Sequence, residues 1–106
     1  SFVFRDTPFN NNYDRVFNFA SGTDQLVLDR DAYTNIGALG DFAAGDGRFY
    51  AAAGAVRGHD ADDRIIYNTS NGNLYYDADG SGAGREMFIG VLHGAPALDA
   101  TDVAII

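Results

Sequence analysis

Short apolar runs separated by polar turns make up the first part of the chain. The runs are residues 2–4, 16–19 and 26–28, and each is followed by a loop rich in Asp, Asn, Gly or Ser. Runs of this length at intervals of about ten residues are typical of short β-strands joined by turns. Their even spacing favours a coiling β structure over a sandwich with long strands.

The clearest pattern begins after residue 62. Residues 64–68 (Arg-Ile-Ile-Tyr-Asn) predict a strand, and residues 69–72 (Thr-Ser-Asn-Gly) predict a hairpin turn with Gly72 in the left-handed conformation. Residues 73–77 then predict the returning antiparallel strand. The intervening segment is less distinct, because residues 32–39 fit a short helix or a loop and residues 43–55 show no clear period.

These patterns predict one all-β domain over residues 1–106. We expect β-roll-like turns in 1–30, an irregular connection in 31–60, and a hairpin with C-terminal strands in 61–106. The absence of cysteine excludes disulfides and thiolate metal sites, and the apolar runs are too short to span a membrane. No basic region followed by an apolar segment marks a cleavable secretion signal. The opening residues read as a strand, which favours a fragment of a longer polypeptide.

The charge is strongly acidic and unusually composed. The chain has fourteen Asp, one Glu and seven Arg, with a formal net charge of −8. This balance argues against nucleic acid or an anionic membrane surface as a partner. The bias toward Asp suggests short carboxylates held beside backbone turns, where they bond their own chain or a metal ion.

The segment 75–84 (Tyr-Tyr-Asp-Ala-Asp-Gly-Ser-Gly-Ala-Gly) has the composition of a Ca²⁺-binding loop. Asp77, Asp79 and Ser81 supply closely spaced oxygen ligands, and the glycines permit sharp turns. The first six residues from Asp77 fit the start of an EF-hand loop, but Phe88 stands where the bidentate Glu is required, so this is not an EF-hand. The alternative is an ordinary surface turn rich in Asp, Gly and Ser.

Catalytic chemistry has little support. His59 and His93 are the only histidines, and they lack metal-ligand spacing. His59 precedes three aspartates (Asp60, Asp62, Asp63), so a His–Asp pair is conceivable, but no motif supplies a nucleophile. We therefore expect the chain not to be an enzyme.

Five segments of the chain carry motifs of one known family: Asp14, Val16, Asn18 and Phe19; Gly22, Asp24, Leu26 and Leu28; Asp62 to Asn68; Gly72, Leu74 and Tyr76 to Gly82; and Asp102 with Val103 to Ile106. Together they resemble RTX proteins, the secreted bacterial proteins with haemolysin-type calcium-binding repeats. The likeness is to the segment that ends serralysin-type proteases, and it is weakest between residues 32 and 58. The intact nonapeptide of the repeats is missing, and Asn18 replaces an expected Asp.

The resemblance implies a non-catalytic module at the end of a parallel β-roll, with a C-terminal antiparallel hairpin and cap. Its partners would be calcium-binding repeats upstream in the same polypeptide and, before folding, a type I secretion apparatus of a Gram-negative bacterium. The protein would be secreted and would bind Ca²⁺. The expected metal ligands are Asp77, Asp79 and Ser81, with Asp14 and Asp24 for a second ion, and the expected secretion signal is Asp102, Val103, Ala104, Ile105 and Ile106.

The last residues are also predicted to form a final strand, with Val103 and Ile105 turned toward the core. Two other functions stay open at this point. Tyr13, Tyr33, Tyr50 and Tyr75 would offer a stacking platform for a carbohydrate if they are exposed, whereas core packing is the alternative for each. The domain would also fit a structural or adhesive unit of a surface assembly.

Overall fold

The structure is a computed structural model that describes residues 2–4, 14–33, 36, 39–59, 61–77, 80 and 86–106, with Asp14 described by its backbone alone. These residues form nine short strands, one 3-10 turn and no α-helix, so the all-β prediction is confirmed. The elements are β1 (Phe2–Phe4), β2 (Asp14–Val16), β3 (Leu26–Leu28), β4 (Gly40–Asp41), β5 (Phe49–Ala52), β6 (Ile65–Asn68), β7 (Asn73–Tyr76), β8 (Met87–Leu92), η1 (Ala100–Asp102) and β9 (Val103–Ile105).

The smaller sheet has the strand order β1-β3-β9-β4. β1, β3 and β9 run parallel, and β4 closes the far edge in the antiparallel direction. Leu26 lies opposite Val103 and Leu28 opposite Ile105, so the end of the chain pairs with a segment near its beginning. This sheet therefore depends on contacts between residues far apart in the sequence.

The larger sheet has the order β2-β8-β7-β6-β5. Its centre is the predicted hairpin, in which Ile65 lies opposite Tyr76 and Tyr67 opposite Leu74. Gly72 ends the turn at φ 81, as the pattern predicts. A Cβ at Gly72 would lie 2.1 Å from the carbonyl oxygen of Leu92, so this position requires glycine both for its conformation and for close backbone approach.

The strand order confirms the predicted all-β class but not the predicted β-roll. Each sheet mixes parallel and antiparallel pairs, whereas a roll is parallel throughout, so an all-β domain with two mixed sheets is what the structure establishes. The second strand also differs from its prediction. β2 ends at Val16, and Phe17 beyond it is 57 % exposed while Phe19 is buried.

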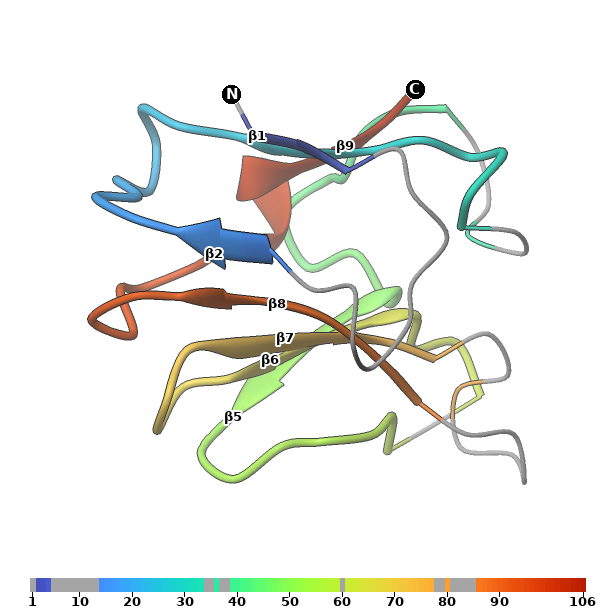
Figure 1. Cartoon of the computed structure of the whole chain (residues 1–106). Helices are drawn as coiled ribbons and strands as arrows, with labels where there is room; N and C mark the ends of the chain where they lie inside the picture. The colour runs from blue at the N-terminus through green and yellow to red at the C-terminus, as the bar shows by residue number, and fades with distance from the viewer. Residues whose placement is uncertain are drawn as a thin grey trace.

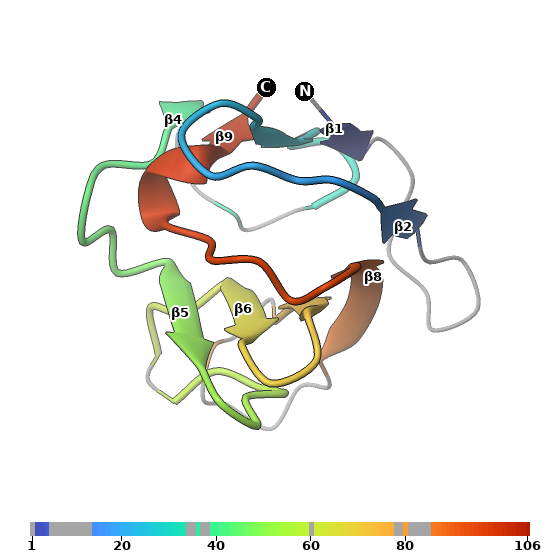
Figure 2. The ribbon, with the colours of Figure 1, turned by 90° about the vertical axis from the view of Figure 1, so that its left-hand side faces the viewer.

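The two sheets face each other across one apolar core. Figure 1 shows β1 and β9 in one layer and β5, β6, β7 and β8 in the other, and Figure 2 shows the same separation from the side. The core draws buried side chains from both layers: Phe4, Leu26, Leu28, Val103 and Ile105 from the smaller sheet, and Val16, Ile65, Tyr67, Leu74, Tyr76, Ile89 and Leu92 from the larger.

The segment expected to be an irregular connection contributes to both layers. Tyr33, Ile36 and Phe42 are buried in the core, and β5 pairs in parallel with β6. Arg48 fixes the chain just before β5 by stacking on the Phe42 ring at 3.9 Å and donating to the Ile36 carbonyl at 3.0 Å. The sequence did not predict β4 or β5, because short Ala- and Gly-rich strands have little apolar periodicity.

Residues 103–105 form the predicted final strand, but its burial differs from expectation. β9 lies between β3 and β4, and all three of its residues are buried. Val103 and Ile105 face the core, and Ala104 is flanked on the opposite face by Val27 and Asp41. Neighbouring strands lie along both edges of β9, and Val27 and Asp41 flank the small side chain of Ala104, which accounts for its burial.

Candidate metal loop and the neighbouring groove

Asp77 lies at the open end of the hairpin, directly after β7. Its carboxylate is buried, and the Gly58 amide donates to Oδ2 at 3.4 Å. The two loops at this end pack closely, because a Cβ at Gly58 would lie 2.8 Å from the Gly80 carbonyl oxygen. Burial of a carboxylate is costly unless hydrogen bonds, a partner charge or a metal ion compensates for it.

A second buried carboxylate, Asp63, occupies the same end of the hairpin. Its Oδ2 accepts from the His59 backbone amide at 2.9 Å and contacts His59 Nδ1 at 2.6 Å. The imidazole ring stacks on Tyr50 with the ring centroids 3.9 Å apart. The conceivable His–Asp pair therefore exists in the structure, formed with Asp63 four residues along the loop.

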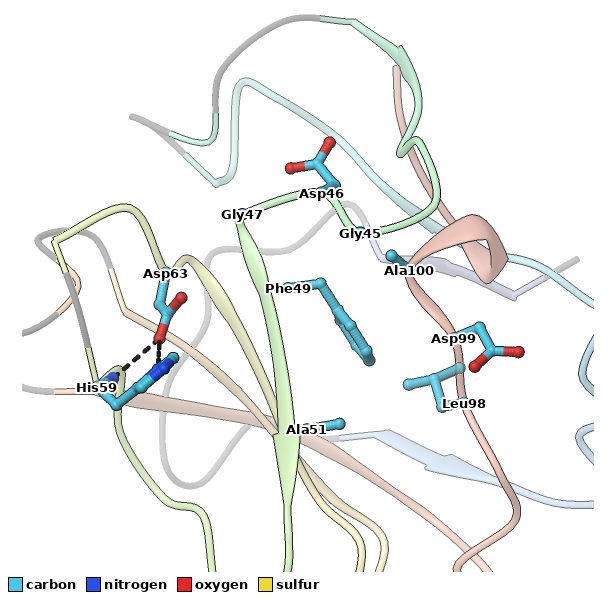
Figure 3. A pocket seen from close by; sticks show the side chains of 10 residues that line it. All are labelled: Gly45, Asp46, Gly47, Phe49, Ala51, His59, Asp63, Leu98, Asp99 and Ala100. Carbon is cyan, nitrogen blue, oxygen red and sulfur yellow. Dashed lines mark hydrogen bonds and ion pairs between the residues drawn. The ribbon is translucent and has the colours of Figure 1, made fainter.

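This pair borders a groove of about 410 Å³ that crosses β5. Figure 3 shows His59 and Asp63 on one side of β5, with Leu98 and Asp99 on the other and Phe49 between them. The described lining residues include no serine, threonine, cysteine or lysine. The arrangement can hold a histidine ring in one orientation, and its described walls offer carboxylates but no hydroxyl, thiol or amine nucleophile.

The expected metal ligands are only partly within the described chain. Asp79 and Ser81 lie outside the described residues, as does the side chain of Asp14. The Asp24 carboxylate accepts from the Ala20 amide at 2.9 Å and so closes a local turn. Among the residues that the structure describes, no three His, Asp or Glu side chains are grouped as a metal site. Binding of Ca²⁺ at Asp77 and Asp79 thus stays a prediction.

Asp102 has a definite place in the fold. Its carboxylate is 3 % exposed and accepts three hydrogen bonds, from Ser21 Oγ at 2.5 Å, the Gly22 amide at 2.9 Å and the Asp99 amide at 2.9 Å. Burial alone would raise its pKa, but the Ser21 hydroxyl and the Asp99 and Gly22 amides outweigh burial, and the pKa lies below the usual value. The sequence did not predict Ser21 and Gly22 as partners of Asp102. They lie 81 and 80 positions before it, and no local pattern links residues so far apart.

The tyrosines do not form one exposed platform. Tyr33 is buried and packs edge-on against Tyr76 with centroids 5.4 Å apart, so core packing is the alternative that holds for this residue. Tyr50 and Tyr75 share a cross-strand row on the face of the larger sheet away from the core. Tyr50 stacks on His59 and Tyr75 packs on Phe88, so protein neighbours already use these rings. Tyr13 lies outside the described residues.

No protein-family model, curated protein or solved structure matches this chain. Within the described segments, no helix has the length and apolar character needed to cross a membrane.

Proposed function

We propose that this chain is a non-catalytic, calcium-binding C-terminal module of an RTX-type secreted protein. It caps a β-roll formed upstream in the same polypeptide and carries in residues 102–106 the segment that a type I secretion apparatus reads. The observation that carries the proposal is the buried carboxylate of Asp77 at the entry to the Asp-x-Asp-Gly-Ser-Gly loop. A buried carboxylate followed by closely spaced oxygen ligands suits a hard cation.

Two features of the fold agree with this function. β1 and β3 pair in parallel in one sheet, and β2, which lies between them in sequence, belongs to the other sheet. A chain that alternates between two sheets in this way has the local geometry of one turn of a β-roll. The tail, residues 102–106, is mostly buried once folded, so recognition of these residues has to precede folding. A net charge of −8 would disfavour folding without a cation, because the carboxylates repel one another. Outside the cell, the free energy of Ca²⁺ binding would add to the free energy of folding.

Calorimetry with Ca²⁺ on the isolated chain tests the metal site. Titration should release or absorb heat, and millimolar Ca²⁺ should raise the melting temperature. The double variant Asp77→Ala/Asp79→Ala should lose both effects, whereas Asp24→Asn should retain them if Asp24 serves only its turn. No heat and no thermal shift in the wild-type chain would refute calcium binding, and a retained shift in the double variant would move the site elsewhere.

Export tests the second half of the proposal. In a Gram-negative host with a matching type I transporter, removal of residues 102–106 should abolish release of the chain to the medium. Normal release of the truncated chain would exclude these residues as the signal. The truncation removes an interior strand, so export has to be measured as total released protein, folded or not.

A further inference from the structure

The hydrogen bonds around Asp102 join two segments from opposite ends of the sequence. Ser21 and Gly22 belong to the turn that leads into β3, and Asp99 belongs to the turn that leads into β9. All three groups donate to one buried carboxylate. The carboxylate therefore holds the start of β9 against the turn at residues 20–24.

The strand that follows is held along its whole length. The Phe42 amide donates to the Val103 carbonyl at 2.8 Å, the Ile106 amide donates to the Leu28 carbonyl at 3.0 Å, and the Arg30 amide donates to the Ile106 carbonyl at 2.9 Å. These bonds repeat the ladder of an interior strand. The hydrogen bonds of Asp102 are different, because they involve a side chain at the entry point of the strand.

The surroundings of Asp102 select a carboxylate. Its described hydrogen-bond partners are all donors: one hydroxyl and two backbone amides. A carboxylate accepts from several donors at once, whereas an amide side chain would have to turn its own donor group toward one of them. Asn at this position is thus a nearly isosteric change that disturbs the hydrogen bonds without altering volume.

We propose that the hydrogen bonds from Ser21 and Gly22 to the Asp102 carboxylate, here called the latch, decide between two exclusive states of the tail, residues 102–106. In one state the tail belongs to the smaller sheet, and in the other it is exposed. With the latch closed on Ser21 and Gly22, residues 103–105 are an interior strand that no export machine can reach. With the latch open, the same residues are an exposed apolar segment headed by a carboxylate. Closing of the latch thereby withdraws the tail into the smaller sheet. This inference rests on the proposed function for the meaning of the open state, but the latch itself is a property of the fold.

Hydrogen exchange on the 106-residue chain tests the latch directly. The variants are Asp102→Asn, Ser21→Ala, which removes one donor from an exposed turn, and Asp31→Asn as a control with the same charge change at an exposed position. Exchange of the amides of residues 103–106 should accelerate by about tenfold or more in Asp102→Asn and about threefold in Ser21→Ala. Asp31→Asn should resemble the wild type, and the amides of the β6–β7 hairpin should accelerate less than those of the tail in Asp102→Asn and Ser21→Ala.

Carboxypeptidase digestion, followed by intact mass, measures access to the tail independently. Loss of residues 106 and 105 should be faster in Asp102→Asn than in the wild type. The latch is overturned if tail exchange is unchanged in both variants, or if the hairpin accelerates as much as the tail, since the latter would be a general loss of stability. If Asp102→Asn does not fold, Ser21→Ala decides alone. Normal export of the truncated chain would refute the secretion signal and leave these exchange results standing.

Discussion

The two sheets of this molecule are assembled by different kinds of contact. At the centre of the larger sheet, β6, β7 and β8 follow one another along the chain and pair as antiparallel neighbours, whereas the edge strand β2 joins from a distant segment. In the smaller sheet, β3 finds β9 near the other end of the sequence, and β4 adds a third distant segment. Local pairing closes short loops, whereas distant pairing has to overcome a larger loss of chain entropy before its contacts form.

The comparison shows where single substitutions should act. A substitution in the β6–β7 hairpin should disturb a geometry that its own turn fixes. A substitution in β9 should weaken the pairing of β9 with β3 and β4, which depends on burial of apolar side chains. The following predictions separate the two, in order of decreasing effect.

Gly72→Ala should destabilise the larger sheet most strongly. Alanine would have to adopt φ 81, and its Cβ would lie 2.1 Å from the Leu92 oxygen. Strain and overpacking together should lower the free energy of unfolding by about 4 kcal/mol, measured by urea denaturation. Gly94→Ala is the matched control, because Gly94 has φ 87 but nothing within 4 Å of an added Cβ. Equal losses in the two variants would show that close approach to Leu92 contributes nothing.

Ile105→Ala should weaken the smaller sheet by about 3 kcal/mol, since it opens a cavity at a buried core position. Ile106→Ala, one residue later at a 45 % exposed position, should change stability by about 0.5 kcal/mol. Urea denaturation of both variants gives the comparison. A small loss in Ile105→Ala would mean that β9 is not integral to the core.

Asp102→Asn should reduce stability by about 2 kcal/mol at pH 7, since it disturbs hydrogen bonds to a charged group. Because the folded pKa of Asp102 lies below its unfolded value, its stabilising contribution is present above the unfolded pKa of about 3.9 and is lost as pH falls through the folded pKa. The gap between wild type and variant should therefore be constant from pH 7 to about 4 and close below that. Thermal melts across this range measure it, and a gap independent of pH would contradict the assignment.

Asp46→Asn should have the smallest effect, about 0.5 kcal/mol. Its hydrogen bond with the Arg48 side chain outweighs desolvation and lowers the pKa of Asp46, but the pair sits near the surface in the turn before β5. The loss should shrink at high salt, where screening weakens exposed charge pairs. A loss as large as that of Asp102→Asn would show that the Arg48 anchor controls the pairing of β5 with β6.

Several elements could be predicted from the sequence because their signals are local. Alternating and continuous apolar runs indicate β1, β3, the hairpin and β9, and the Thr-Ser-Asn-Gly turn fixes the hairpin at Gly72. The β-strand at Phe49–Ala52 could not be predicted, because its Ala-rich sequence gains strand character only from its pairing with β6. Asp77 lies directly after the predicted hairpin and is buried there, whereas Ca²⁺ binding by the segment that follows stays a prediction.

The sequence by itself determined that this is an acidic, cysteine-free, all-β chain with a hairpin at residues 64–77 and a strand at its end. Only the tertiary structure decided which strands meet, and it brought Ser21 and Gly22 to Asp102 and His59 to Asp63. The reason is physical. Periodicity and turn chemistry act over a few residues, whereas pairing between distant segments is decided by which arrangement buries the apolar faces and satisfies the buried carboxylates together.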